Sequence, residues 1–111
     1  MIFSWDVWNI DHIAKHGVTP ADAEYVVRNA ESPFPRVLAD DKLVVWGQAE
    51  DGTYVQVIFV YRELEEVDFG ALTLEQLVSI SEGDVSDVLY VVHAMPLSPK
   101  MLRQYRRLRR R

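Results

Sequence analysis

The sequence predicts an α+β fold with an N-terminal strand and two helices, an antiparallel sheet of about four strands, and a C-terminal helix. Apolar residues recur at helical spacing in the first 30 positions. Runs rich in Val, Ile and aromatic residues follow between positions 36 and 61, and a capped helix start lies at Ser98. With 111 residues, of which 49% are hydrophobic and 26% charged, the chain is expected to form a single domain over 1–111.

The first third of the chain is predicted to form a short strand and two helices. Ile2 to Trp5 is an apolar run of a length that suits an edge strand. Gly17 ends a first helix, whose apolar residues fall near helical spacing at Trp8, Ile10, Ile13 and Ala14. Thr19-Pro20-Ala21-Asp22 starts a second helix, because it combines an N-cap residue, a proline at the first helical position and a reciprocal acid.

Strand signals dominate the middle of the chain. Three segments rich in β-branched and aromatic residues are predicted strands: Arg36 to Ala39, Lys42 to Ala49 and Tyr54 to Tyr61. Asp51-Gly52 predicts a hairpin turn between the last two, since both residues tolerate positive φ. The run VLYVVHA, from Val88 to Ala94, is almost continuously apolar and predicts a strand that is buried on both faces or central in the sheet.

Charge is strongly segregated along the chain. The formal net charge is −5, yet seven of the 12 Lys and Arg residues lie between Lys100 and Arg111. They belong to a predicted basic helix over 98–111, which starts at Ser98-Pro99 and has one apolar face formed by Met101, Tyr105 and Leu108.

The segment 63–87 has the opposite character, with eight acids and no cation. Thr73 and Gln76 have the spacing of a capping box, so we interpret the segment as an acidic insertion that contains a short helix.

Composition excludes several classes of protein. The absence of cysteine excludes a disulfide scaffold, thiol catalysis and thiolate metal sites. The N-terminus has neither a basic leader nor a long apolar run, and no segment approaches the roughly 18 apolar residues that a membrane span needs. We therefore expect a cytoplasmic protein without membrane association.

Seven residues near the N-terminus carry a resemblance to a known family: Trp5, Asp6, Asn9, Lys15, His16, Gly17 and Val18. They are similar to the Trp-Asp pair, the Asn and the Lys-His-Gly-Val turn of the BrnT family of bacterial toxins. The hairpin from Gly47 to Gly52 and the stretch VVHAMPLSPKMLRQY extend the resemblance over about three-quarters of the chain.

The resemblance implies a RelE/BrnT-like fold and a function. BrnT-like proteins resemble RelE-type toxins, are taken to cleave RNA without a metal, and are neutralised by a ribbon-helix-helix antitoxin. Such cleavage needs a base for the ribose 2′-OH, cations for the phosphorane and a proton donor for the leaving oxygen. In this chain the family's motif arginine falls on Met95 and a usual Glu falls on Met101, whereas Arg103 and Tyr105 keep the family's residue types.

Our candidate catalytic residues are His93, Arg62, Lys100, Arg103, Tyr105 and His16. Strand alternation places His93 on the same face as Met95. Lys100 or Arg103, from the helix that follows, would then supply a phosphate contact. The alternative interpretation of His93 is a half-buried histidine with a structural hydrogen bond.

Other residues admit two interpretations each. His12 and His16 lie four apart on a helix and could face one metal, but no third ligand is evident, and His16 with Lys15 suits a helix C-terminus. For the tryptophans we favour core packing over base stacking: Trp5, Trp8 and Trp46. Arg62 is expected to pair with Glu63.

The basic helix has three interpretations. It contacts nucleic acid, or docks a partner through its apolar face, or frays over its last five residues. An intramolecular option is that it pairs with the acidic segment 63–87.

Our leading hypothesis is a BrnT-like endoribonuclease toxin of a type II toxin–antitoxin pair, or a relative that has lost the activity. A non-catalytic protein-binding module of the same fold is the first alternative. A small nucleic-acid-binding protein that uses the basic helix is the second. We expect a ribbon-helix-helix antitoxin as partner and RNA as substrate, allow for a homodimer, and expect neither a cofactor nor a metal.

Overall fold

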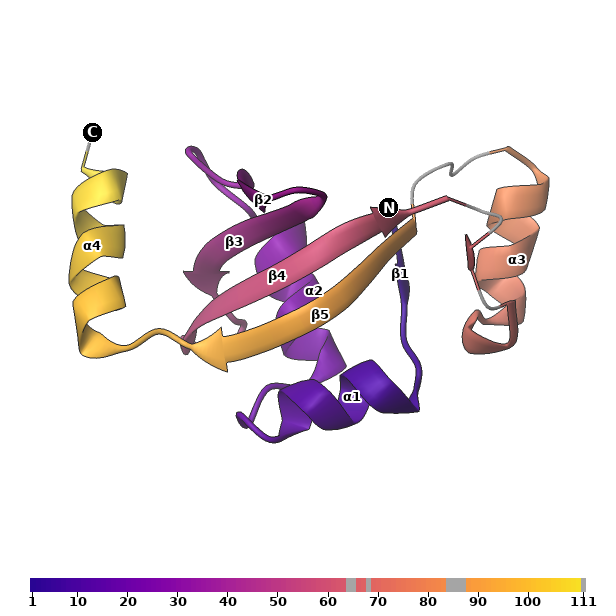
Figure 1. Cartoon of the computed structure of the whole chain (residues 1–111), viewed down its shortest axis with the longest axis horizontal. Helices are drawn as coiled ribbons and strands as arrows, with labels where there is room; N and C mark the ends of the chain where they lie inside the picture. The colour runs from indigo at the N-terminus through magenta and orange to yellow at the C-terminus, as the bar shows by residue number, and fades with distance from the viewer. Residues whose placement is uncertain (64–65, 68, 84–87, 111) are drawn as a thin grey trace.

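The computed structural model describes residues 1–63, 66–67, 69–83 and 88–110, and its elements can be followed in Figure 1. In chain order these are β1 (Ile2–Ser4), α1 (Val7–Ala14), α2 (Pro20–Arg28), β2 (Arg36–Ala39), β3 (Lys42–Gln48), β4 (Tyr54–Arg62), the 3₁₀ helix η2 (Phe69–Ala71), α3 (Leu74–Ser81), β5 (Val88–Pro96) and α4 (Pro99–Arg109). The predicted α+β class is confirmed, and each predicted helix and strand is present in the described residues.

The strands form one sheet in the order β1-β5-β4-β3-β2. The pairs β2–β3, β3–β4 and β4–β5 are antiparallel, whereas β1 runs parallel to β5 with Phe3 opposite Leu89. The four strands β2 to β5 are antiparallel as predicted, and β1 lies at an edge as predicted. The described sheet is nevertheless mixed and five-stranded, because β1 joins it by parallel pairing, which was not predicted. The strand β1 has only three residues, too few for an alternation of apolar and polar side chains that would predict its pairing. Its partner β5 also lies far away in the sequence.

The hydrophobic core lies between one face of the sheet and the two N-terminal helices. Phe59 and Leu89 from the sheet pack with Ile13 of α1 and Val26 of α2 in one buried cluster. Burying these side chains is the main favourable contribution to the fold. Figure 1 looks onto the opposite side of the sheet, which no described helix crosses, and we call this side the open face.

Side-chain hydrogen bonds connect helix α1 to strands β1 and β5. The side chain of Asn9 is fully buried, with 0% exposed. Its carbonyl accepts the Asp6 N–H at 2.8 Å and its amide donates to the Ser4 carbonyl at 3.2 Å. The carboxylate of Asp6 accepts the Asn9 N–H at 3.0 Å and the Tyr90 hydroxyl at 3.0 Å to each oxygen. These bonds fix the helix against β1 and β5.

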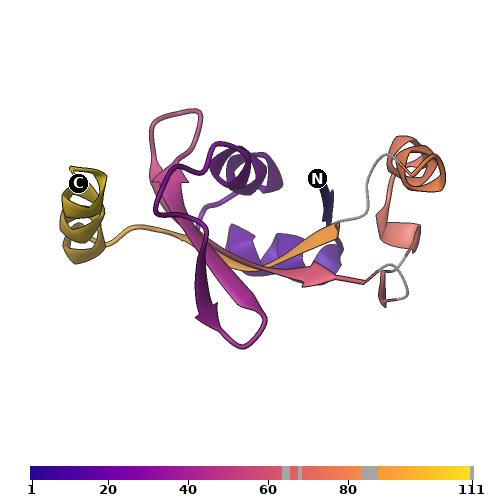
Figure 2. The ribbon, with the colours of Figure 1, turned by 90° about the horizontal axis from the view of Figure 1, so that it is seen from above.

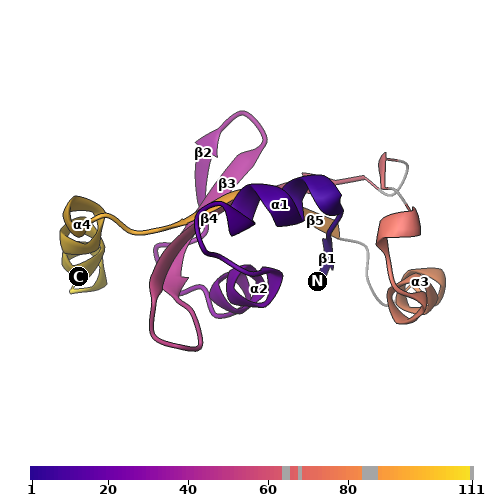
Figure 3. The ribbon, with the colours of Figure 1, turned by 90° about the horizontal axis from the view of Figure 1, so that it is seen from below.

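Helices α3 and α4 lie at opposite ends of the molecule, beyond the two ends of β5, as Figures 2 and 3 show from above and below. The principal extents are 42 × 29 × 27 Å. The described part of the acidic segment 63–87 therefore does not lie against the basic helix, and that interpretation was wrong. The full length of β5 separates the two segments; Leu64, Glu65, Asp68 and residues 84–87 lie outside the described residues.

Helix α4 packs through its apolar side against its own domain. Tyr105 and Leu108 contact the main core, and Arg109 donates to the Ser32 carbonyl at 2.8 Å and pairs with Glu31. The apolar side is thus occupied, which overturns its use as a free docking face. Fraying is also wrong for Arg107 to Arg109, which are helical; Arg111 is not among the described residues.

Membrane-spanning helices are absent from the described residues, since none of their helices has the necessary length and apolarity.

We predict that Asn9→Ala lowers the free energy of unfolding by about 2–3 kcal/mol, because it removes a cap bond and leaves a buried carbonyl unsatisfied. Urea denaturation measures the change. The matched control is Asp22→Ala, which breaks the equivalent capping box of α2 at an exposed position and should cost about 1 kcal/mol or less. Equal losses in the two variants would contradict a special role for the buried amide.

Candidate functional site: a histidine cluster beside a stacked aromatic row

The structure brings all three histidines of the chain together. His93 Nδ1 of β5 lies 3.4 Å from His12 Nε2 of α1. The ring centre of His16, just beyond the end of α1, lies 5.1 Å from that of His93 and 6.3 Å from that of His12. We call His12, His16 and His93 the histidine cluster. The sequence suggested His93 and His16 as separate candidates and did not assign His12 a catalytic role.

A β-bulge in β5 turns His93 toward the open face. Val91 pairs with Phe59, but His93 pairs with the preceding residue of β4, Ile58, so Val92 is an extra residue in the strand. A one-residue shift reverses which face each later side chain occupies. Val91 and Ala94 therefore belong to the core cluster, while His93 shares the open face with Met95.

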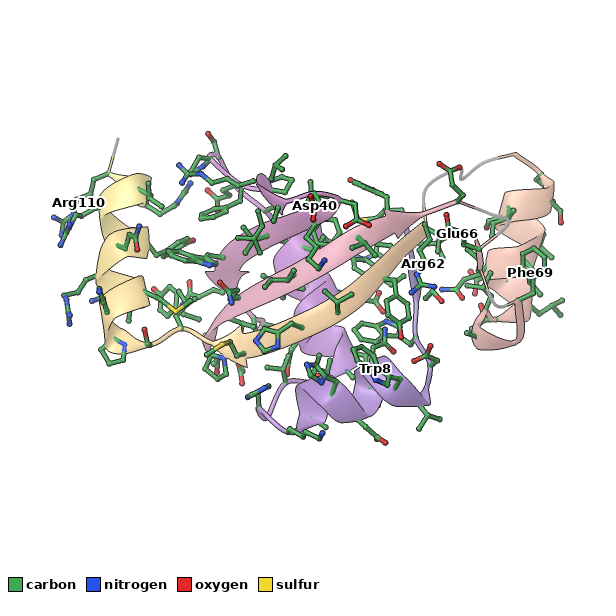
Figure 4. The ribbon with its side chains drawn as sticks, in the orientation of Figure 1. Trp8, Asp40, Arg62, Glu66, Phe69 and Arg110 are labelled. Atoms are coloured by element: carbon green, nitrogen blue, oxygen red, sulfur yellow. The ribbon has the colours of Figure 1, made fainter. Side chains whose placement is uncertain are left out.

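A row of stacked side chains continues from the cluster along α1 and β5. The rings of Trp8 and His12 lie 5.0 Å apart and are nearly parallel, with 5° between their planes. Tyr90 stacks at 6.4 Å from Trp8, and the Arg62 guanidinium lies 4.0 Å from the centre of the Tyr90 ring. We call Arg62, Tyr90, Trp8 and His12 the stacked row. Figure 4 shows Trp8 where α1 passes β5, and Arg62 nearer the α3 end.

Two expectations for this row were wrong. Trp8 is 57% exposed and does not pack in the core, whereas Trp5 and Trp46 pack against the core as predicted. Arg62 forms no ion pair with Glu63 or with any other described residue, because its guanidinium lies over an aromatic ring instead. The signal that could have identified Trp8 is its position four residues before His12, which places both rings on one side of a helix.

A shallow depression of about 520 Å³ lies beside the cluster. It is lined by residues of α1 and its C-terminus: Val7, Trp8, Asp11, His12 and Lys15. Lys15 and Asp11 make no ion pair in the described chain, so the Lys15 ammonium is available to an anion.

The environment sets distinct protonation states for His93 and Tyr90. Burial lowers the pKa of His93, and the charges of His16 and His12 lower it further. His93 is therefore a neutral proton acceptor at neutral pH. Burial, followed by the hydrogen bond to Asp6, raises the pKa of Tyr90 to about 12. Tyr90 consequently stays protonated and acts as a donor to Asp6, not as a base.

The remaining predicted residues lie elsewhere. Lys100 and Arg103 are exposed on α4, and neither forms a hydrogen bond or ion pair with His93 in the described chain. The ring of Tyr105 lies 6.1 Å from Phe34 and 5.8 Å from Tyr54, and burial raises its pKa. The structure thus groups His93 and His16 but separates both from the α4 candidates.

No group of three or more metal-ligating side chains with a suitable arrangement occurs in the part of the chain that the structure describes.

We predict that His93 titrates below the ordinary histidine pKa of about 6.5, and that His16→Gln moves its pKa upward because a neighbouring positive charge is removed. The shift should be partial, since burial is the larger cause. NMR titration of the imidazole protons measures both values. Arg103→Gln removes a positive charge on α4 and should leave the His93 pKa unchanged. A larger response to Arg103→Gln than to His16→Gln would contradict the observed cluster.

Comparison of the chain with protein-family models, curated proteins and solved structures found no match. The relation to BrnT-like toxins and the RelE/BrnT-like fold therefore stay predictions.

Proposed function

We propose that this protein is a metal-free endoribonuclease of the toxin type, with its acid–base chemistry in the histidine cluster. The observation that carries the proposal is the contact between His93 and His12 on a sheet face that no described helix crosses. A neutral imidazole has one N–H and one bare nitrogen, so two imidazoles in contact provide a proton acceptor and a proton donor within one site.

The chemistry requires both functions. His93, kept neutral by its lowered pKa, takes the proton of a ribose 2′-OH. The 2′-oxygen attacks the adjacent phosphorus, the P–O5′ bond breaks, and a protonated imidazole of the cluster gives its proton to the departing 5′-oxygen. The products are a 2′,3′-cyclic phosphate and a 5′-hydroxyl, and no metal is needed. Imidazoles in the roles of base and acid each contribute about 10²–10⁴-fold to such a reaction.

Charge stabilisation is assigned to residues outside the family motif. Met95 occupies the position of the motif arginine and cannot bind phosphate. Lys15 lines the same depression as His12, and Arg62 has no ion-pair partner among the described residues. Lys15, beside His12, takes the place of the missing arginine, and Arg62, at the far end of the stacked row, contacts a neighbouring phosphate of the strand. The proposal also includes a cytoplasmic location and a ribbon-helix-helix antitoxin as partner.

The first test is cleavage of RNA by the purified protein in the presence of EDTA. We expect fragments with 2′,3′-cyclic phosphate ends, and we expect His93→Gln and His12→Gln each to lower kcat by about 10²–10⁴-fold. Growth arrest on induced expression should disappear in the same variants. Intact RNA and normal growth with the unaltered protein would exclude a nuclease.

The double variant Lys100→Gln/Arg103→Gln decides between two locations of the phosphate contact. A fall in kcat comparable to that of His93→Gln would place these residues in the reacting site. A rise in KM that grows with salt, with kcat unchanged, would assign them to general attraction of RNA.

A second candidate function, a protein-binding module, is favoured by the exposed apolar residues of the α3 end. Phe69, Leu74 and Val78 are all exposed, Leu74 at 77%, and Figure 4 shows Phe69 directed away from the sheet. The acids Glu75 and Glu82 lie on the same helix or at its cap. Such a surface suits a partner with apolar anchors and a basic rim.

Leu74→Asp and His93→Gln separate the two functions. If the neighbouring gene encodes a partner, the protein-binding module predicts that Leu74→Asp weakens the isolated complex at least tenfold, while His93→Gln has no effect on any cellular activity. Calorimetry of the purified pair and growth assays measure the two outcomes.

The third hypothesis, nucleic-acid binding through α4, is favoured by exposed cations without ion-pair partners in the described chain: Lys100, Arg103, Arg106 and Arg107 of the helix and Arg110 at its C-cap.

A further inference from the structure

We infer that Trp8 is a stacking platform for an unpaired nucleobase, and that the ligand of this site is single-stranded RNA. The inference rests on the proposed function for its choice of RNA, and it adds a base-binding subsite beside the reacting groups. It assigns to Trp8 a positioning role that is separate from proton transfer.

The first observation is the exposure of one tryptophan among three. Trp5 donates its indole N–H to Glu24 at 2.9 Å, and Trp46 donates to Gln56 at 2.8 Å, so both are packed and hydrogen-bonded. Trp8 is 57% exposed, and its indole N–H has no acceptor among the described residues. Leaving a large apolar ring in water is unfavourable, and this position is therefore a candidate for contact with a ligand.

The second observation is that the Trp8 ring is held in a fixed orientation. His12 stacks on it with 5° between the planes, and Tyr90 stacks at 6.4 Å. Tyr90 is itself held by the Asp6 carboxylate and by the Arg62 guanidinium. At 5.0 and 6.4 Å between ring centres, these neighbours cover only part of the indole, and Trp8 stays 57% exposed. A base that stacks on the uncovered part loses less conformational entropy, because the ring's orientation is already restricted.

The third observation is the chemistry on the two sides of the indole. His12, which stacks on Trp8, also contacts His93, so a base on Trp8 would place a neighbouring phosphate near the histidine cluster. The guanidinium of Arg62 lies beyond Tyr90, and Lys15 lines the depression that Trp8 also lines. An aromatic surface with a cation on each side matches a nucleotide chain, which alternates flat bases with phosphates.

A base can stack on Trp8 only if it is not already stacked between its neighbours in a duplex. The site therefore requires a single-stranded nucleic acid. Bases in an RNA duplex present only their edges, whereas those of single strands are free to stack on aromatic side chains. The interaction tolerates any base, since every base has a π-face. The site is therefore expected to discriminate single-stranded from duplex RNA more strongly than it discriminates one base sequence from another.

The experiment measures binding of a 2′-O-methyl oligonucleotide of eight residues, which has no free 2′-OH and cannot be cleaved. We expect the single strand to quench tryptophan fluorescence, and expect Trp8→Ala to weaken binding by about 10- to 100-fold. Trp8→Phe should retain part of the affinity, because it keeps an aromatic face. The same sequence as a duplex should bind equally to the unaltered protein and to Trp8→Ala.

Ile10→Ala is the matched control, since Ile10 is exposed on the same helix and belongs to neither the stacked row nor the depression. It should leave the affinity unchanged. Circular dichroism and urea denaturation establish that each variant is folded. Arg106→Gln/Arg107→Gln tests the alternative in which α4 holds the strand.

Each outcome has a definite meaning. Equal affinities of Trp8→Ala and the unaltered protein overturn the inference, as does loss of binding only in the α4 variant or failure of the unaltered protein to bind. Trp8-dependent binding without any RNA cleavage supports the base subsite and refutes the nuclease. With cleavable RNA, the inference predicts that Trp8→Ala raises KM, while His93→Gln lowers kcat.

Discussion

The Asp6–Asn9 capping box, with the buried amide of Asn9 and the bond from Tyr90 to Asp6, is the interaction on which the rest of the arrangement depends. It starts α1, joins that helix to β1 through the Ser4 carbonyl, and joins it to β5 through the Tyr90 hydroxyl. Because α1 is held beside β5 at this point, His12, six residues after Asp6, reaches His93. The same carboxylate orients Tyr90 and through it Trp8 and Arg62. The hydrogen bonds of Asp6 and Asn9 thus position both the histidine cluster and the stacked row.

The second constraint is the bulge at Val92. Strict alternation from Val91 would direct His93 into the core, where an imidazole would lack a partner and destabilise the domain. The extra residue reverses that direction and places His93 beside His12. Partial burial then keeps the imidazole neutral. Because of this local irregularity of the backbone, a strand that otherwise contributes to the core also presents a histidine on the open face.

Charge segregation acts over a longer range. The cations of α4 and the acids of the segment that contains α3 lie at opposite ends of a molecule 42 Å long, so they do not neutralise each other within one chain. A polyanion would be attracted to the α4 end and repelled from the α3 end. The histidine cluster lies between the two, on β5 and the end of α1. This polarity gives any polyanion a preferred direction of approach.

The sequence by itself determined the local elements, because their signals are local. Thr19, Thr73 and Ser98 each accept the predicted N-cap bond, and the helices begin where these residues place them. Strand positions followed from β-branched runs in the same way. Part of the site could also be predicted from the sequence, since His93 and His16 were identified as candidates. Only the tertiary structure decided the parallel pairing of β1, the exposure of Trp8, the separation of α3 from α4 and the contact of His12 with His93. These features depend on contacts between residues far apart in the chain, or on the unpaired Val92 in β5. Neither kind of feature produces a periodic pattern of residues in the sequence.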